Sequence, residues 1–144
     1  MEQHILVPVD TSSSSESAFE YVLEEIPRPT ITLLHVINPL TVFNYVRAEG
    51  FDYEKSQQKE RERREAVEQI FDGYRSKDAA RDREIKTVIE AGNPAERILE
   101  YTEDRGVDHI VMGSRGRSGL EEKLLGSVAK DVVKRSSVPV TIVP

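Results

Sequence analysis

Four glycines lie within residues 113–127, the last of them directly before a serine, in the sequence GSRGRSGLEEKLLGS. Because glycine lacks a Cβ, a loop of this kind lets backbone N–H groups approach a phosphate closely. Gly126 and Ser127 lead into a helical pattern, whose first N–H groups and dipole favour an anion. The Ser127 hydroxyl adds a further donor, so these residue types are suited to holding phosphate.

Positive charge is concentrated in the same region. Residues 113–135 contain six Lys or Arg against three Asp or Glu, whereas the whole chain has a net charge of -6. Arg115 and Arg117 lie within the glycine-rich stretch itself. A flexible loop before a helix with a Lys-Arg pair at its C-terminus also fits these residues. The stretch has neither a Walker A nor a GxGxxG spacing, so the residues alone leave both interpretations open.

Other residue types offer little catalytic chemistry. His4, His35 and His109 lie in three separate apolar runs without metal-ligand spacing, and we expect hydrogen bonds to hold each one. Residues 12–15 are four serines that suit a helix N-cap, and no GxSxG elbow is present. The chain has no cysteine. We therefore expect no catalytic residue.

Five short apolar runs alternate with helical patterns along the chain. The runs typical of buried parallel strands are residues 4–9, 30–37, 85–89, 107–112 and 138–143. Apolar residues recur at helical spacing within 18–26, 67–74, 98–101 and 128–133. The alternation predicts an α/β fold in one domain of residues 1–144. We expect an open five-stranded parallel sheet of order 3-2-1-4-5 with helices on both faces.

Such a sheet binds ligands beyond the carboxyl ends of its strands, where the winding reverses between the first and fourth strands. The first strand leads to Asp10 and the fourth to Gly113, so the glycine-rich stretch meets an acidic residue there. Asp10 is the acid best placed to hold a divalent cation. The alternative for Asp10 is a turn residue that caps neighbouring N–H groups.

Two segments are expected to lie outside this site. Residues 54–65 are almost wholly polar and predict a solvated or frayed helix end. The aromatic residues within 43–53 are more typical of a small satellite cluster or a partner contact than of a stacking platform for bases.

Composition limits the class of protein. Apolar residues make up 38% and charged residues 32%, as in soluble globular domains. No signal peptide is visible, and no apolar run approaches the roughly 18 residues of a membrane span. We therefore expect a cytoplasmic protein without membrane partners. A pI of about 5.2 argues against nonspecific nucleic-acid binding as its main role.

The spacing Gly113-x2-Gly116-x9-Gly126-Ser127 resembles the nucleotide-binding signature of the universal stress protein family, in its ATP-binding branch. The resemblance extends along the chain through ILVPVD, LLHVI, EAGNPAERIL, VDHIVMGSRG and SSVPVTIVP, in the order of the family's segments. It implies a Rossmann-like, adenine nucleotide alpha hydrolase-like fold. It also implies ATP with Mg²⁺ or Mn²⁺ as ligands.

The resemblance assigns positions in the nucleotide site to twelve residues. The residues implied to border the ribose and phosphates are Pro8, Val9 and Asp10, and Asp10 would reach the metal directly or through water. Val36 would contact adenine, with Met112 and Gly113 at the base of the pocket. The residues implied to hold the phosphates are Gly116, Gly126, Ser127 and Val128. The basic positions typical of the family are Arg115 and Arg117.

The implied function is nucleotide-dependent regulation in a stress response, with slow ATP hydrolysis as the most that catalysis would contribute. A homodimer is expected through residues 138–143, an uncharged edge strand of the kind across which family members commonly pair.

Two alternatives remain. One is a dimeric family member that binds no nucleotide. The other is an adenine-nucleotide enzyme, such as a nucleotidyltransferase or an adenylating synthetase. The HxGH and SGGxDS signatures of those enzymes are absent near the first strand.

Overall fold

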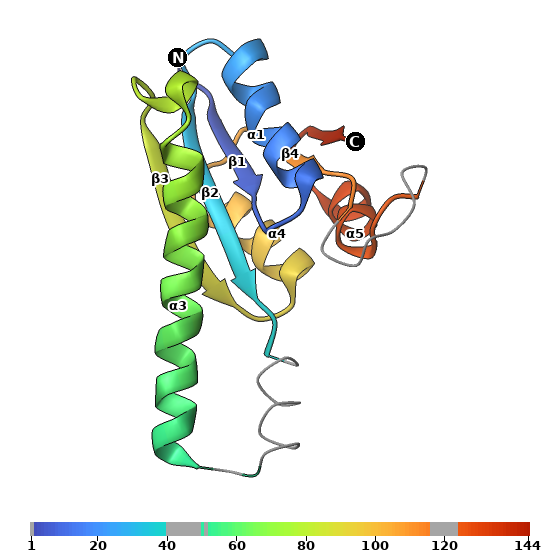
Figure 1. Ribbon diagram of the computed structural model, residues 1–144. Helices are drawn as coiled ribbons and strands as arrows, with labels where there is room; N and C mark the ends of the chain where they lie inside the picture. Colours follow the sequence, from blue (N-terminus) through green and yellow to red (C-terminus); the bar gives the residue numbers. More distant parts are fainter. Residues whose placement is uncertain (1, 40–49, 51, 116–123) are drawn as a thin grey trace.

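A five-stranded parallel sheet forms the centre of the protein (Figure 1). The computed structural model describes residues 2–39, 50, 52–115 and 124–144. The strands are β1 (His4–Pro8), β2 (Thr30–Ile37), β3 (Ile85–Ala91), β4 (His109–Gly113) and β5 (Val140–Val143). Their order is β3-β2-β1-β4-β5, and all four pairings are parallel. The sequence prediction of this order is confirmed.

Helices cover both faces of the sheet, as predicted. The helices are α1 (Ser13–Glu25), α3 (Tyr53–Arg75), α4 (Pro94–Asp104) and α5 (Ser127–Arg135), with a short 3-10 helix at Asp78–Ala80. Alternate β1 residues divide the core, because successive strand side chains point to opposite faces. Ile5 and Val7 pack with α1 and α3, whereas Leu6 packs with α4 and α5.

Local sequence explains where two of these helices begin. The Ser12 side chain accepts a hydrogen bond from the Ser15 N–H at 3.2 Å, which caps α1 as the serine run predicts. Asn93 caps α4 in the same way, and Pro94 occupies the first turn, where proline's missing N–H costs nothing. In α5 the apolar pattern is only partly buried, since Val133 is 47% exposed.

Helix α3 is long and only partly supported by the core. Its buried residues, Val67, Phe71 and Tyr74, all lie in the C-terminal half. The N-terminal half extends past the ends of the strands (Figure 1), and most of its side chains are exposed. The expected polar segment 54–65 is thus a regular, solvated stretch of helix. Within the described part of the chain, no helix combines the length and apolar character that a membrane crossing requires.

Candidate functional site

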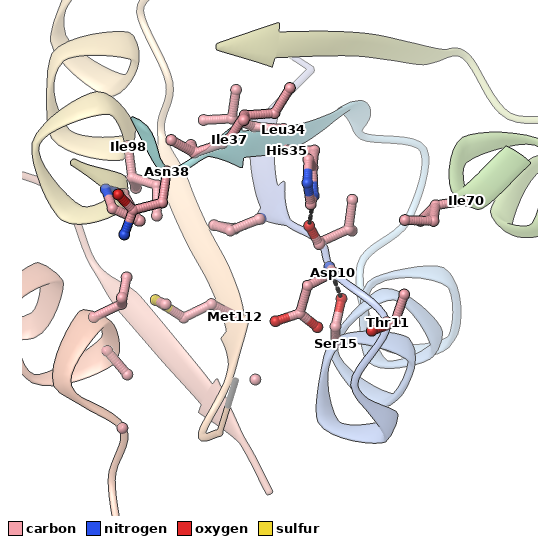
Figure 2. A pocket seen from close by; sticks show the side chains of 18 of the residues that line it. Asp10, Thr11, Ser15, Leu34, His35, Ile37, Asn38, Ile70, Ile98 and Met112 are labelled. Atoms are coloured by element: carbon pink, nitrogen blue, oxygen red, sulfur yellow. Dashed lines mark hydrogen bonds between the residues drawn. The ribbon is translucent and has the colours of Figure 1, made fainter. Parts of the chain in front are cut away.

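A cavity of about 580 Å³ lies beyond the carboxyl ends of β1, β2 and β4. Its walls come from residues 8–11 at the end of β1, residues 34–38 at the end of β2, residues 112–115 at the end of β4 and residues 126–129 at the start of α5. Further lining residues come from α3 and α4 (Figure 2). The cavity therefore occupies the place where the winding of the sheet reverses, which is where open parallel sheets bind ligands.

Ten of the twelve residues predicted from the sequence line this cavity: Pro8, Val9, Asp10, Val36, Met112, Gly113, Arg115, Gly126, Ser127 and Val128. The other two, Gly116 and Arg117, lie outside the described residues. Segments far apart in the sequence are thus brought to one site. The part that each residue plays toward a nucleotide stays a prediction.

Asp10 is both a turn residue and a lining residue. One carboxylate oxygen, Oδ1, accepts the Ser12 N–H at 2.7 Å, and the Asp10 N–H donates to Ser15 Oγ at 3.1 Å. The second oxygen, Oδ2, has no hydrogen-bond partner among the described residues. The part of the chain that the structure describes contains no group of three metal-ligating side chains. A cation here would take one protein oxygen from Asp10 and fill its other positions with water or ligand oxygens.

Gly113 is required for packing between β4 and α1. A Cβ at this position would lie 2.7 Å from the Ser14 backbone carbon and would also meet the Ser14 side chain. The Ser14 hydroxyl donates to the Arg115 carbonyl at 2.7 Å and accepts the Arg115 N–H at 3.3 Å. Ser14 therefore anchors the start of the glycine-rich stretch. In the sequence it was visible only as part of a serine run that suits a helix cap.

Ser114 carries an unpartnered hydroxyl at the cavity. Its backbone N–H donates to the Val143 carbonyl at 2.9 Å, and its carbonyl accepts the Gly126 N–H at 2.7 Å. The residue is only 6% exposed, and its Oγ has no hydrogen-bond partner among the described residues. A buried hydroxyl without a partner costs free energy, so a ligand that bonded to it would relieve that cost. Sequence reasoning missed Ser114, although it lies inside the glycine-rich stretch.

The first turn of α5 presents free backbone donors to the same cavity. No side chain among the described residues caps this nine-residue helix, whose N-cap is Gly126. Ser127, Val128 and Ala129 line the cavity, and the N–H groups of a first helical turn have no partner within the helix. The backbone angles of Gly126, φ −63° and ψ 157°, are accessible to any residue. The lack of a side chain at the cavity wall is therefore the property that glycine supplies here.

Hydrogen bonds hold all three histidines, as expected. His35 lines the cavity, and its Nδ1 donates to the Val9 carbonyl at 2.8 Å (Figure 2). His4 Nε2 lies 2.8 Å from Thr32 Oγ1, and His109 Nε2 lies 2.7 Å from Thr141 Oγ1. Burial lowers the pKa of His109 below its usual range.

Tyr74 links α3 to the turn after β1. Its hydroxyl lies 2.8 Å from Ser15 Oγ, which also accepts the Asp10 N–H. Burial, as the largest cause, raises the pKa of Tyr74 to about 12. The phenol is thus neutral at ordinary pH and can both donate and accept in this network.

Helix α3 also contributes to the cavity wall through Arg63, Ala66, Val67 and Ile70. Arg63 belongs to the polar segment that was expected to lie outside the site. It is half-buried, whereas its neighbours on either side are exposed. No local pattern in the sequence distinguishes it from the other charged residues of α3.

Known proteins resemble this chain in sequence and in structure. The model of the universal stress protein family matches residues 1–144. Universal stress protein MJ0577 of Methanocaldococcus jannaschii is 32% identical, over 99% of this chain and 95% of that protein. Its solved structure gives a TM-score of 0.81, covering 99% of this chain and 96% of that one at 31% identity. Universal stress protein YxiE of Bacillus subtilis is also 32% identical, over 99% of both chains.

Two more distant structures with this fold were solved with a nucleotide. One is a universal stress protein family protein of Arabidopsis thaliana with AMP bound, at 21% identity and a TM-score of 0.66, covering 98% of this chain and 90% of that one. The other is a universal stress protein in complex with cAMP, at 22% identity and a TM-score of 0.59, covering 99% and 96%. Likeness at these identities shows the fold alone. The family match over residues 1–144 and the two relatives at 32% identity go further: this chain belongs to the universal stress protein family.

Proposed function

We propose that this protein binds ATP, together with Mg²⁺ or Mn²⁺, in the cavity at the carboxyl edge of the sheet. The observation that carries the proposal is the buried, unpartnered Ser114 hydroxyl beside the uncapped first turn of α5. A hydroxyl and several N–H groups converging on one cavity match the needs of a phosphate. AMP and cAMP, the ligands of the two more distant structures, also make adenine nucleotides the first class to test.

Within this proposal, different described residues would contact different parts of the nucleotide. Ser114, Ser127 and Val128 would hold phosphate oxygens through hydroxyl and N–H groups, with Arg115 supplying positive charge. Val36 would contact adenine, and Met112 would lie at the bottom of the pocket with Gly113, as the family resemblance implies. Asp10 would offer Oδ2 to the cation, whose role is to neutralise phosphate charge and orient the phosphates. Gly116 and Arg117, which the family resemblance also assigns to the nucleotide site, lie outside the described residues.

We propose that the protein uses bound ATP for regulation and does not turn it over as an enzyme. Among the described residues lining the cavity, Asp10 is the one carboxylate. His35 already donates its Nδ1 proton to the Val9 carbonyl. These residues do not form a nucleophile with an adjacent oriented base. A bound nucleotide would instead shift the protein toward the conformation that it binds best, which a partner could then recognise.

Calorimetric titration of nucleotide-free protein with ATP and Mg²⁺ tests this function. Mass spectrometry of the denatured protein would first identify any ligand that copurifies. Binding should also raise the melting temperature, because a ligand specific to the native state stabilises it by about 2.7 kcal/mol at a hundred times its Kd. Folded, nucleotide-free protein that gives neither heat nor a melting shift with ATP would refute the proposal.

We also propose a homodimer through β5, which lies at one edge of the described sheet. The Pro139 carbonyl accepts the Ile110 N–H of β4, and the Val143 carbonyl accepts the N–H of Ser114, directly after β4. Because strand groups alternate in direction, the Thr141 N–H also faces β4, whereas Val140 and Ile142 direct theirs to the open edge. A second copy could pair with those groups about a two-fold axis.

Light scattering tests the dimer. Val140→Pro removes an edge-facing N–H at the first residue of the strand, a position where proline is tolerated. We expect it to weaken the dimer while circular dichroism stays unchanged. A wild-type mass equal to one chain, with and without ATP, would contradict the arrangement.

A further inference from the structure

One face of α3 runs alongside the cavity. The lining residues Arg63, Ala66, Val67 and Ile70 have the spacing i, i+3, i+4 and i+7, which places them on one stripe of a helix. The stripe continues into the core through Phe71 and Tyr74. Arg63 is therefore the cationic end of an otherwise apolar surface.

Arg63 differs from the neighbouring cations of the same helix. Lys59 forms an ion pair with Glu62 at 3.8 Å, and Arg64 forms one with Glu60 at 3.7 Å. Arg63 has no hydrogen bond or ion pair with any described residue, although it is half-buried. A partly desolvated guanidinium without an anion is a position at which a bound anion would be stabilised.

The charges around the cavity support an anionic occupant. The charged residues that line it are Asp10, Arg63 and Arg115, which leaves a surplus of one positive charge. In Figure 2 Asp10 lies between Met112 and Ile70, so the α3 wall is on the far side of Asp10 from Met112. The buried Val67 and the half-buried Ile70 exclude water from part of this wall, which strengthens a charge interaction.

We propose that Arg63 binds a phosphate group of the ligand at the α3 end of the cavity, separate from the phosphate position at the first turn of α5. This inference rests on the proposed function, since it assumes that a nucleotide occupies the cavity. Arg63 would be a ligand-binding residue contributed by a helix that the glycine signature does not include. The phosphate comes from one of two sources, the 5′ polyphosphate chain or a phosphate on the ribose.

The test compares Arg63→Gln with Arg64→Gln, a matched substitution one residue away. Arg64 pairs with Glu60 and does not line the cavity. Each variant and the wild type would be titrated calorimetrically with adenosine, AMP, ATP and adenosine 3′,5′-bisphosphate. The differences between AMP and adenosine and between ATP and AMP report phosphates of the 5′ chain. The difference between the bisphosphate and AMP reports a phosphate on the ribose.

We expect Arg63→Gln to weaken binding of at least one phosphorylated ligand about tenfold, as for loss of a charge-assisted hydrogen bond. Adenosine affinity should not change, and Arg64→Gln should behave as the wild type throughout. The wild-type affinity for that ligand should also fall more steeply with salt than that of Arg63→Gln.

Three other outcomes would overturn the inference. If Arg63→Gln and Arg64→Gln bind every ligand equally, Arg63 touches no phosphate, and the proposed function stands. If Arg63→Gln weakens adenosine as much as ATP, the side chain shapes the cavity rather than binding an anion. If the wild type binds none of these ligands, the proposed function fails and this inference with it.

Discussion

Replacing Ser114 with alanine should change folding stability and ligand affinity in opposite directions. The substitution removes only Oγ, which is buried and has no hydrogen-bond partner among the described residues. In the unfolded chain that hydroxyl is fully exposed to water, whereas in the fold it is buried and bonds to no described residue. An unsatisfied buried polar group costs about 1–3 kcal/mol. The lower end applies here, because the side chain borders an open cavity, so Ser114→Ala should stabilise the ligand-free protein by about 1 kcal/mol.

ATP binding should respond with the opposite sign. If Ser114 Oγ donates to a phosphate oxygen, its loss removes a hydrogen bond to a charged group, worth about 1.5–3 kcal/mol. The Kd for ATP should therefore rise by about tenfold to a hundredfold. Urea unfolding of the ligand-free protein and calorimetric titration with ATP measure the two effects separately.

Ser14 provides the matched control, as a second buried serine near the same loop. Ser14→Ala removes the 2.7 Å bond to the Arg115 carbonyl and the 3.3 Å bond from the Arg115 N–H. It should lower folding stability by about 1–3 kcal/mol and weaken ATP binding, so both effects have the same sign. If Ser114→Ala destabilises the ligand-free protein, or binds ATP like the wild type, the assignment of Ser114 to a phosphate is wrong.

Gly126→Val should abolish ATP binding with little change in melting temperature, because its side chain would enter the phosphate position. Gly73→Val is the control, since a Cβ at Gly73 meets no atom within 4 Å. Normal ATP binding by Gly126→Val would show that the phosphates bind elsewhere. Gly113→Ala should instead lower folding stability by about 1–3 kcal/mol in urea unfolding, because the added methyl overlaps the Ser14 backbone, and a variant as stable as the wild type would contradict that packing role. Stability should fall as pH rises from about 10 to about 12, because the folded state keeps the Tyr74 proton at pH values where the unfolded state has lost it. Tyr74→Phe should flatten this decline in unfolding experiments across that range, and an unchanged slope would argue against a perturbed phenol.

The sequence by itself determined the architecture. Buried parallel strands are short apolar runs, and amphipathic helices repeat every three to four residues, so both are local patterns that can be read along the chain. Their alternation indicated parallel pairing, and the switch-point rule then placed Asp10 and the glycine-rich stretch at one edge of the sheet. Ten of the predicted site residues line the cavity for this reason. The ends of strands were predicted less accurately. The strand expected to begin at residue 138, β5, begins at Val140.

Only the tertiary structure decided which side chains meet across that edge. The contact between Gly113 and Ser14 joins residues almost a hundred positions apart, and it explains one signature glycine by packing rather than by phosphate access. Ser114 became a candidate for phosphate binding because its hydroxyl is buried without a partner among the described residues. Arg63 became one because it lies on the face of α3 that lines the cavity. The spacing of apolar residues indicates on which face of its own helix or strand a residue lies. The partner that the residue meets depends on how the ends of distant elements come together, which no local pattern encodes.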